Sequence, residues 1–501
     1  MPQELPGFYF DAEKNRYFPI KGPVPGSSSK LSTQKMVSKT TQAAKLSPRI
    51  GVMTSKLLHG RELNGKFFAS NRGKLSFEEE FQKIQASRPD IWRYRGTDNV
   101  ADSTLERMLI DLQTPEGQTE TDFLLAGGIN GSLSFLEVGK DGKHFDYGVT
   151  CIPNHVWPSG RVNLSSSGVA PQHIWRPPGA SLQTSSRISS LKVTGKYSSL
   201  ATDDASRAQH ALITTLGSEF SGGYVYILSL IEPIDVTSMI HERMHVVAPF
   251  NCTIWTADYN SHTSQAVIGT NVGAALVDVE TGTSSWVCHC KSDVLAQQFD
   301  QSGNLVLCGL RNGAIVTVDV REKQVVSARL IKHRIPYLSS ERSGRKPWFE
   351  LKGHISLSST VYMPSSISSL ASLQLYDQYF LASSMDGSIK LYDHRLTKRG
   401  AVQSYEGHVN SHMRIKLGVD QSERFVMSGG EDCYLRLWSI KSGKLIFEDK
   451  FSESVLSTIC WRRSERGGDG RLTYEEELYG QCPILGAWLG SQEGIFHMQW
   501  S

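Results

Sequence analysis

Two histidines spaced four residues apart give the chain its clearest enzyme-like pattern, the run HERMH at residues 241–245. On a helix, His241 and His245 would share one face and bind Zn²⁺, while the glutamate between them would act as a general base. The residues that follow argue against a helix, because Val246 begins an apolar stretch that soon reaches Pro249. No glutamate lies about 20 residues downstream to complete such a site. We therefore expect a segment that passes from loop to strand, not a zinc peptidase.

Cysteines offer a second route to metal chemistry, because Cys288 and Cys290 flank His289. Adjacent residues of a strand point to opposite faces, and no second pair of ligands follows. The eight cysteines are spread irregularly through strand-like segments, unlike the dense framework of a small secreted protein. We interpret them as buried free thiols. The chain also lacks a phosphate-binding loop, a dinucleotide fingerprint and a nucleophile elbow, so we expect no enzyme activity, no metal and no cofactor.

A repeated hairpin is the dominant pattern from residue 104 onward. Its clearest copy, residues 380–395, reads FLASSMDGSIKLYDHR: a strand of small and apolar residues, an Asp-Gly turn, and an alternating strand. Similar hairpins occupy residues 124–138, 212–230, 267–279, 306–321, 425–438 and 485–500. Repeats of roughly 40–45 residues with four strands each indicate a β-propeller. The sequence therefore predicts an all-β, seven-bladed propeller, with its largest irregular stretches at 140–186 and 322–362.

Closure of this ring has to involve both ends of the chain. Residues 485–500 supply the third strand of the last blade, and the sequence stops at Ser501. An open strand edge would promote aggregation. We expect an N-terminal segment, within about residues 55–112, to add the fourth strand.

The hairpins resemble WD repeats, in which a His, a strand Ser or Thr, a turn Asp and a Trp are hydrogen-bonded in series across one blade. In the unit that follows Gly407, the matching residues are His408, Asp432 and Trp438, with Gly430 where a hydroxyl is usual. The preceding unit offers Ser384 and Asp386, and His354 lies about nine residues too far upstream to be their partner. The resemblance implies that these residues have a structural role.

Residues 380–395 also match, at every position, the sixteen-residue DWD box that some WD-repeat proteins carry. Residues 306–321 match it less closely. In proteins with this box the last arginine contacts the propeller adaptor of cullin-4 RING ubiquitin ligases, damage-specific DNA-binding protein 1. The resemblance implies that five residues of this chain bind the adaptor: Asp319, Arg321, Tyr392, Asp393 and Arg395. An alternative remains that Asp-x-Arg serves only to pack the blades.

Other segments resemble one family in particular, the fourth of the cullin-4-adaptor-associated WD-repeat factors. They are residues 5–18, 292–299, 405–410 and 431–438. The likeness implies a non-catalytic substrate receptor that presents a protein target for ubiquitination, with cullin-4 and the RING subunit as indirect partners. The alternative is a ligase-independent scaffold that binds peptides or histone tails. The target itself stays unknown.

The N-terminal hundred residues change character several times. Residues 1–18 form an aromatic motif that we expect to fold as a hairpin, and it binds a partner or packs on the propeller; its aromatic residues are Phe8, Tyr9, Phe10, Tyr17 and Phe18. Residues 19–49 are basic, lack acids and predict a flexible linker. Within 50–103, Ser76 and Glu79 suggest a capping box for a helix whose apolar face packs on the propeller or in a partner's groove. The propeller then spans 104–501.

Composition limits the remaining partners. The 501 residues include 53 Lys+Arg against 50 Asp+Glu, a formal net charge of +3, which leaves no whole-chain basic surface for nucleic acid. The sequence contains no run of about 18 apolar residues, so it predicts no membrane span. The N-terminus lacks the features of a signal peptide. We expect a nuclear or cytoplasmic protein that binds neither membrane nor nucleic acid.

Overall fold

A computed structural model describes most of the chain. It describes residues 8–11, 16–19, 55, 57–62, 67–70, 73–114, 117–139, 148–159, 170–177, 179–193, 210–218, 221–230, 234–235, 240–260, 262–321, 330–334, 348–352, 360–461 and 486–500. The chain divides into two units, Met1–Met53 and Thr54–Ser501. No helix in the described part of the chain has both the length and the hydropathy that a membrane crossing requires.

The first unit contains the predicted aromatic hairpin. Strand β1 (Phe8–Asp11) pairs with β2 (Arg16–Pro19) in antiparallel register, so that Tyr9 faces Phe18 and Phe10 faces Tyr17. The basic linker, from residue 20 onward, lies outside the described residues.

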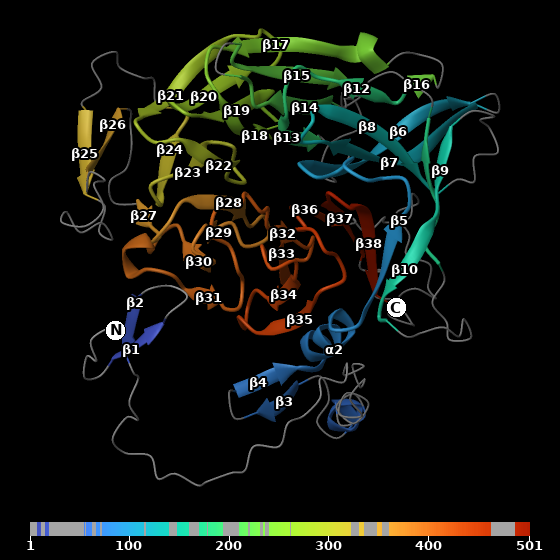
Figure 1. Ribbon diagram of the computed structural model, residues 1–501, viewed down its shortest axis with the longest axis vertical. Helices are drawn as coiled ribbons and strands as arrows, with labels where there is room; N and C mark the ends of the chain where they lie inside the picture. Colours follow the sequence, from blue (N-terminus) through green and yellow to red (C-terminus); the bar gives the residue numbers. More distant parts are fainter. Residues whose placement is uncertain are drawn as a thin grey trace. The chain divides into compact units, whose positions relative to one another are not determined.

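The second unit is a β-propeller, with seven blades in the described part of the chain (Figure 1). In blades 2 to 6 the first strand is innermost and three further strands follow it outward in chain order. Blade 1 contains β6 (Thr104–Thr114), β7 (Gly117–Gly127), β8 (Ser132–Val138), β11 (Ile174–Arg176), β12 (Ser181–Gln183), β9 (Val149–Cys151) and, beside β6, β16 (Ile234–Asp235). Blade 2 contains β13 (Ile188–Val193), β14 (His210–Thr215), β15 (Gly223–Ser229) and β17 (Met244–Phe250). Blade 3 contains β18 (Ile254–Asn260), β19 (Gln265–Thr270), β20 (Gly273–Asp278) and β21 (Ser284–Cys290).

The remaining four blades follow the same plan. Blade 4 contains β22 (Val294–Phe299), β23 (Leu305–Leu310), β24 (Ala314–Asp319) and β27 (Val361–Tyr362). Blade 5 contains β28 (Ile367–Ser372), β29 (Tyr379–Ser384), β30 (Ile389–Asp393) and β31 (Gln403–Tyr405). Blade 6 contains β32 (Gly418–Val419), β33 (Phe425–Gly429), β34 (Leu435–Ser439) and β35 (Leu445–Asp449). Blade 7 contains β36 (Thr458–Trp461), β37 (Gly486–Ser491), β38 (Gly494–Trp500), β5 (Pro89–Tyr94) and β10 (Pro153–Trp157).

Each of the seven predicted hairpins forms the second and third strands of a blade, as the turn chemistry requires. At Asp386-Gly387, for example, Gly387 has φ +82°, and a Cβ there would lie 2.6 Å from the carbonyl oxygen of His408. Only glycine adopts this conformation without strain. The structure therefore confirms the propeller fold that the turn sequences predicted.

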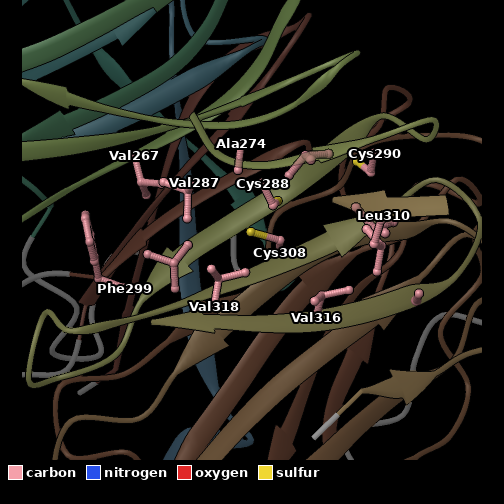
Figure 2. Packing of buried hydrophobic residues seen from close by; sticks show 14 residues of the cluster. Val267, Ala274, Val287, Cys288, Cys290, Phe299, Cys308, Leu310, Val316 and Val318 are labelled. Atoms are coloured by element: carbon pink, nitrogen blue, oxygen red, sulfur yellow. The ribbon is translucent and has the colours of Figure 1, made fainter. Parts of the chain in front are cut away.

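Hydrophobic side chains are buried between neighbouring blades. Among the described residues there is one buried cluster for each pair of adjacent blades, including the pair formed by blades 7 and 1. Figure 2 shows the cluster between blades 3 and 4, where Cys288 of β21 and Cys308 of β23 lie among valines. Both are buried free thiols, as predicted, and so are Cys151 and Cys290, whereas Cys252, Cys433 and Cys460 are free but only half-buried. Cys482 lies outside the described residues. A closed set of blade interfaces leaves no blade without a neighbour.

Strand β5 closes the ring, which confirms the expected N-terminal fourth strand. It pairs antiparallel with β38, so that Ile91 lies opposite Met498, and both side chains are buried in the same cluster. Strand β10 then pairs with the outer edge of β5. Blade 7 is thus assembled from segments about four hundred positions apart in the chain, as shown by the 400-residue separation of Arg93 and its hydrogen-bond partner Glu493.

The predicted helix is α2 (Phe77–Ala86), which follows the hairpin of β3 (Phe67–Ser70) and β4 (Gly73–Ser76). The capping box is wrong in detail, because the Ser76 side chain makes no capping hydrogen bond. Glu79 instead forms an ion pair with Lys441 of blade 6, at 2.8 Å. At its other end the helix packs on blade 7, where Trp500 Nε1 donates to the carbonyl oxygen of Ala86 at 2.8 Å. The helix therefore packs on the protein's own propeller.

Short strands occur in both stretches that the sequence suggested were irregular. Residues 140–186 supply β9, β10, β11 and β12. Within 322–362, β25 (Leu330–Arg334) and β26 (Trp348–Lys352) form a hairpin that extends the sheet of blade 3 beyond β21. These additions thicken the outer side of the ring and leave its hairpins unchanged.

Candidate functional site

The two Asp-x-Arg sequences lie at equivalent places in neighbouring blades. Asp319 is the last residue of β24 and Asp393 is the last residue of β30, each the third strand of its blade. Third strands run in the same direction in every blade, so Arg321 and Arg395 emerge at the same end of the propeller. Below, this is called the arginine end.

In both pairs the aspartate holds its arginine in the same way. In blade 5 one carboxylate oxygen of Asp393 accepts from the backbone N–H of Arg395 at 2.8 Å and from its Nε at 3.1 Å. The other oxygen accepts from Nη2 at 2.9 Å. In blade 4 the corresponding distances between Asp319 and Arg321 are 2.9, 3.0 and 2.6 Å. Each carboxylate therefore both stabilises the turn and fixes the guanidinium as a bidentate fork.

The arginines are far more exposed than their aspartate partners. The side chains of Arg321 and Arg395 are 65% and 67% exposed, whereas those of Asp319 and Asp393 are 23% and 4% exposed. The hydrogen bond from Arg395 lowers the pKa of Asp393, and the hydrogen bond from Arg321 lowers the pKa of Asp319. The hydrogen bond to Asp393 in turn raises the pKa of Arg395. Both forks therefore stay ionised over the whole physiological range, and each displays a fixed positive charge to a partner.

The end of β30, which precedes Arg395, is packed into the core. Tyr392 is buried and its ring stacks on Phe380, with ring centroids 5.4 Å apart. His394 also lies against Phe380, at 4.7 Å, and its burial lowers its pKa. Tyr392 thus supports the fork from the core and does not itself reach the surface.

A loop with exposed apolar side chains borders Arg395. Residues 373–378 connect β28 to β29, and Leu375 and Tyr376 are 66% and 52% exposed. The carbonyl oxygen of Gln378 accepts from the backbone N–H of His394 at 2.9 Å, which joins this loop to the segment that carries Arg395. Leu396, directly after Arg395, is a further exposed apolar residue.

One carboxylate of the next blade holds this apolar loop in place. Glu423 accepts hydrogen bonds from three consecutive backbone N–H groups, those of Gln374, Leu375 and Tyr376, the latter two at 3.0 and 3.1 Å. Glu423 is itself buried. The arginine end of blades 4 and 5 therefore combines two fixed cations with an ordered apolar rim.

The residues of the WD relay are close together but are linked differently from the family pattern. His408 Nε2 lies 2.9 Å from the carbonyl oxygen of Gly429 and 3.2 Å from Ser428 Oγ, so Ser428 provides the hydroxyl that Gly430 lacks. Trp438 Nε1 donates to the carbonyl oxygen of Glu406 at 2.9 Å. Asp432 instead accepts from Arg436 at 3.0 and 2.6 Å, because that arginine lies four residues further along the same hairpin.

In blade 5, Asp386 has a purely local role. It accepts from the backbone N–H and the Oγ of Ser388, at 3.1 and 2.7 Å, across its own turn. Burial opposes the ionisation of Asp386, but the hydrogen bonds from Ser388 outweigh it, so the pKa is lowered. His354, the doubtful partner, lies outside the described residues.

The zinc-peptidase pattern is not on an α-helix. Residues Ile240–Arg243 form a single 3₁₀ turn, and β17 begins at Met244, so the two histidines do not share a helix face. Within the described ranges there is no group of three or more His, Cys, Asp or Glu residues that could hold a metal ion. The loop-to-strand interpretation is confirmed.

Sequence patterns alone did not identify three features of this propeller. Leu375 and Tyr376 lie in a loop with no motif, and Glu423 is known to hold that loop only from its contacts. A group of basic residues near the ring axis, including Arg414 and Lys416, was also missed, although their i, i+2 spacing next to an innermost strand was a signal.

Comparisons with known proteins find similarity to the same family that the sequence segments resemble. Residues 348–450 match the family model described as the DDB1- and CUL4-associated factor 4 beta-propeller domain. The matched region covers β26 through the end of blade 6 and includes the Arg395 fork.

Several curated relatives match over longer regions. The chain is 25% identical over 462 residues to human DDB1- and CUL4-associated factor 4, which covers 88% of this chain and 78% of that protein. It is 24% identical over 463 residues to the Bos taurus protein of the same name, with the same coverage. It is 35% identical over 188 residues to human DDB1- and CUL4-associated factor 4-like protein 2, which covers 38% of each chain. The resemblance inferred from the sequence is confirmed.

Proposed function

We propose that this chain, which resembles DDB1- and CUL4-associated factor 4 along most of its length, is a substrate receptor of a cullin-4 RING ubiquitin ligase. It performs no chemistry itself. It binds the ligase's propeller adaptor and holds a protein target, so that a ubiquitin-conjugating enzyme recruited to the same complex reaches a lysine of that target. The receptor thus raises the effective concentration of the target's lysine at the conjugating enzyme and does not lower an intrinsic barrier.

The observation that carries this proposal is the pair of equivalent arginine forks. A guanidinium that is already oriented loses little side-chain entropy when it binds. After its bonds to Asp393, the Arg395 fork retains N–H groups that can donate to backbone carbonyls or carboxylates of a partner. Two such forks on adjacent blades define an orientation as well as a contact.

The apolar rim beside Arg395 suits the same role. Protein interfaces commonly combine arginine with aromatic and aliphatic residues in a centre that excludes water. Leu375, Tyr376 and Leu396 provide that apolar area next to the fork. We therefore assign the adaptor to the arginine end of blades 4 and 5.

The test is to measure adaptor affinity for purified variants by calorimetry or biolayer interferometry. We expect Arg321→Ala/Arg395→Ala to weaken binding at least about tenfold, because each lost charged contact removes about 1.5–3 kcal/mol. Tyr376→Ala should weaken it by a smaller factor. A matched control is Arg311→Ala, since Arg311 also forms an exposed ion pair with an aspartate, at 2.8 Å, but lies in the turn at the opposite end of blade 4.

The outcomes separate the alternatives. Undiminished binding by a folded double variant would show that the forks only pack the blades. Failure of the wild-type chain to bind the adaptor at all would favour the ligase-independent scaffold.

A further inference from the structure

Basic side chains from opposite sides of the ring converge at its axis. Arg187 and Lys192 belong to blade 2, whereas Arg414 and Lys416 directly precede β32 of blade 6. Arg414, Lys192 and Arg187 nevertheless lie close enough to Lys416 for their positive charges to lower its pKa. Arg187 lowers the pKa of Arg414 in the same way. Only side chains that point toward the axis can approach one another across the ring.

Arg414 makes this convergence direct. Its Nη2 donates to the carbonyl oxygen of Trp255 at 2.6 Å and to that of Leu295 at 3.1 Å. These carbonyls belong to β18 and β22, the innermost strands of blades 3 and 4. The side chain therefore extends from blade 6 to the far side of the ring.

Among the described residues, three carboxylates act on these four cations and do not balance their charge, and one of them, Asp102, acts on Arg187. Asp258 pairs with Lys192 at 3.3 Å, and Glu106 is the other carboxylate that acts on Lys192 and Lys416. Among the described residues, no carboxylate lies within ion-pair distance of Lys416. Burial and the neighbouring cations lower the pKa of Lys416 to about 8, and burial together with Arg187 lowers that of Arg414 to about 10.

The loop that delivers Arg414 is already ordered. The side-chain amide of Asn410 donates to the carbonyl oxygen of Met413 at 2.9 Å, and its oxygen accepts from the backbone N–H of Met413 at 3.0 Å. Glu431 accepts from the backbone N–H groups of His412 and Met413, at 2.9 and 3.0 Å. Arg414 Nε is buried and has no hydrogen-bond acceptor among the described residues. A half-buried arginine side chain that is held in place and has an unused donor is suited to an anionic ligand.

An aromatic ring is placed between two of the cations. The Trp255 ring lies 5.7 Å from the guanidinium carbon of Arg414 and 5.4 Å from that of Arg311. Arg187, Trp255 and Arg414 all lie where innermost strands begin, whereas the third strands that carry the adaptor-binding forks end at the other end. An adaptor bound at the arginine end would thus not cover the end of the axis at which these three residues lie.

We propose that this axial site, formed by Arg187, Lys192, Trp255, Arg414 and Lys416, binds an acidic peptide segment of the target protein. The inference rests on the proposed function, because it names the chemical class of the substrate that the receptor would present. Carboxylates match both the planar donors of arginine and the compact charge of lysine. Nucleic acid is a poorer fit, since two carboxylates, Asp258 and Glu106, lie among these cations and would repel the closely spaced phosphates of a strand.

The experiment uses the full-length chain and fluorescence anisotropy with a labelled glutamate-rich peptide. We expect Lys416→Gln to weaken binding at least about fivefold, and Arg414→Gln/Lys416→Gln at least about tenfold, because charge-assisted contacts are lost. Lys441→Gln is the matched control, since Lys441 lies after β34, at the arginine end of blade 6. The same peptide with glutamine at each glutamate should bind at least about tenfold more weakly than the acidic one.

Several results would overturn the proposal. They are equal binding of the glutamine peptide, unchanged affinity of the folded Lys416→Gln variant, and preference for a single-stranded oligonucleotide over the acidic peptide. The side chain of Lys416 makes no ion pair or hydrogen bond to another described residue, and its backbone hydrogen bond to Ser457 does not depend on the side chain. Its glutamine variant should therefore fold, and its apparent Tm checks this. A phosphoserine peptide tests whether phosphate substitutes for carboxylate.

Failure here is distinguishable from failure of the proposed function. Lys416→Gln should bind the adaptor with wild-type affinity, and Arg321→Ala/Arg395→Ala should bind the acidic peptide with wild-type affinity. Loss of peptide binding in the fork variant would show that the axial site is not independent.

Discussion

The carboxylate of Asp393 acts on Arg395 in two ways, through its backbone and through its guanidinium. The bond to the backbone N–H defines the turn after β30, and the bonds to Nε and Nη2 fix the direction in which the side chain points. An exposed arginine without this partner would sample many rotamers. The aspartate of an Asp-x-Arg sequence therefore determines how readily the arginine can bind.

Replacement of Asp393 by asparagine separates the two actions. We expect Asp393→Asn to preserve the turn, because its amide oxygen still accepts from the backbone N–H of Arg395, so the apparent Tm should change little. The fork loses the charge and one acceptor, and ordering the freed arginine on binding costs about 0.5–1.5 kcal/mol. Adaptor affinity should fall about 2- to 10-fold in biolayer interferometry. Asp293→Asn, which frees Arg311 at the opposite end, serves as the control, and equal affinities for both variants and wild type would contradict this role.

At the scale of single elements, the second and third strands could be predicted and the outer strands could not. A hairpin such as residues 306–321 carries two signals at once, the turn sequence Asn-Gly and a strand of β-branched residues after it. Outer strands such as β27, with two residues, and β11, with three, are too short to show any period. These strands form only because they pair with the edge of an existing blade. The sequence stretches that contain them therefore show no strand pattern of their own.

The loop before β32 is an element whose order depends on one ionised side chain. Burial opposes the ionisation of Glu431, but hydrogen bonds from Ser411, His412 and Met413 outweigh it and lower the pKa to about 2, from the usual 4.5. A lowered pKa stabilises the folded state above the pKa of the unfolded chain. That contribution is then lost as the pH falls from about 4.5 to about 2.

We expect Glu431→Gln to reduce the free energy of unfolding by about 1.5–3 kcal/mol at pH 7, because charged hydrogen bonds become neutral ones. The difference in apparent Tm from wild type should shrink as the pH is lowered through 4.5, where the wild-type carboxylate also becomes neutral in the unfolded chain. Thermal melts by circular dichroism across this pH range test the effect. Glu453→Gln is the control, since the Glu453 side chain is 85% exposed and forms an ion pair with Lys450 on the surface. A Tm difference that does not depend on pH would contradict the role of the charge.

At the scale of the whole molecule, sequence patterns could predict the ring but not what lies at its centre. The axial site joins Arg187 to Lys416, residues from blades that are not neighbours, and no local pattern encodes a contact across the ring. The cationic character of this site also does not favour basic ligands such as histone tails, one of the alternatives left open by the sequence. Ring closure was predictable because it follows from counting strands, a global property that a sequence with clear repeats reveals.

Closure by β5 makes the stability of the propeller depend on a segment that precedes its first blade. Without β5, strand β38 would present an unpaired edge, and the cluster between blades 6 and 7 would lose Ala86 and Ile91. The unit Met1–Met53 contributes no strand to any blade among the described residues. Two truncations therefore have opposite expected outcomes.

We expect deletion of residues 1–53 to leave a monomer that unfolds cooperatively near the wild-type temperature, and deletion of residues 1–94 to give a chain that aggregates. Size-exclusion chromatography and calorimetry distinguish these results. Ile91→Ala in the full chain gives a graded form of the same test, because truncation of a fully buried isoleucine costs about 2–5 kcal/mol. Arg88→Ala, just before β5, should change stability by no more than about 0.5 kcal/mol. A soluble 1–94 deletion that melts like the full chain would show that blade 7 is stable with three strands, and that the ring does not depend on pairing between the two ends of the chain.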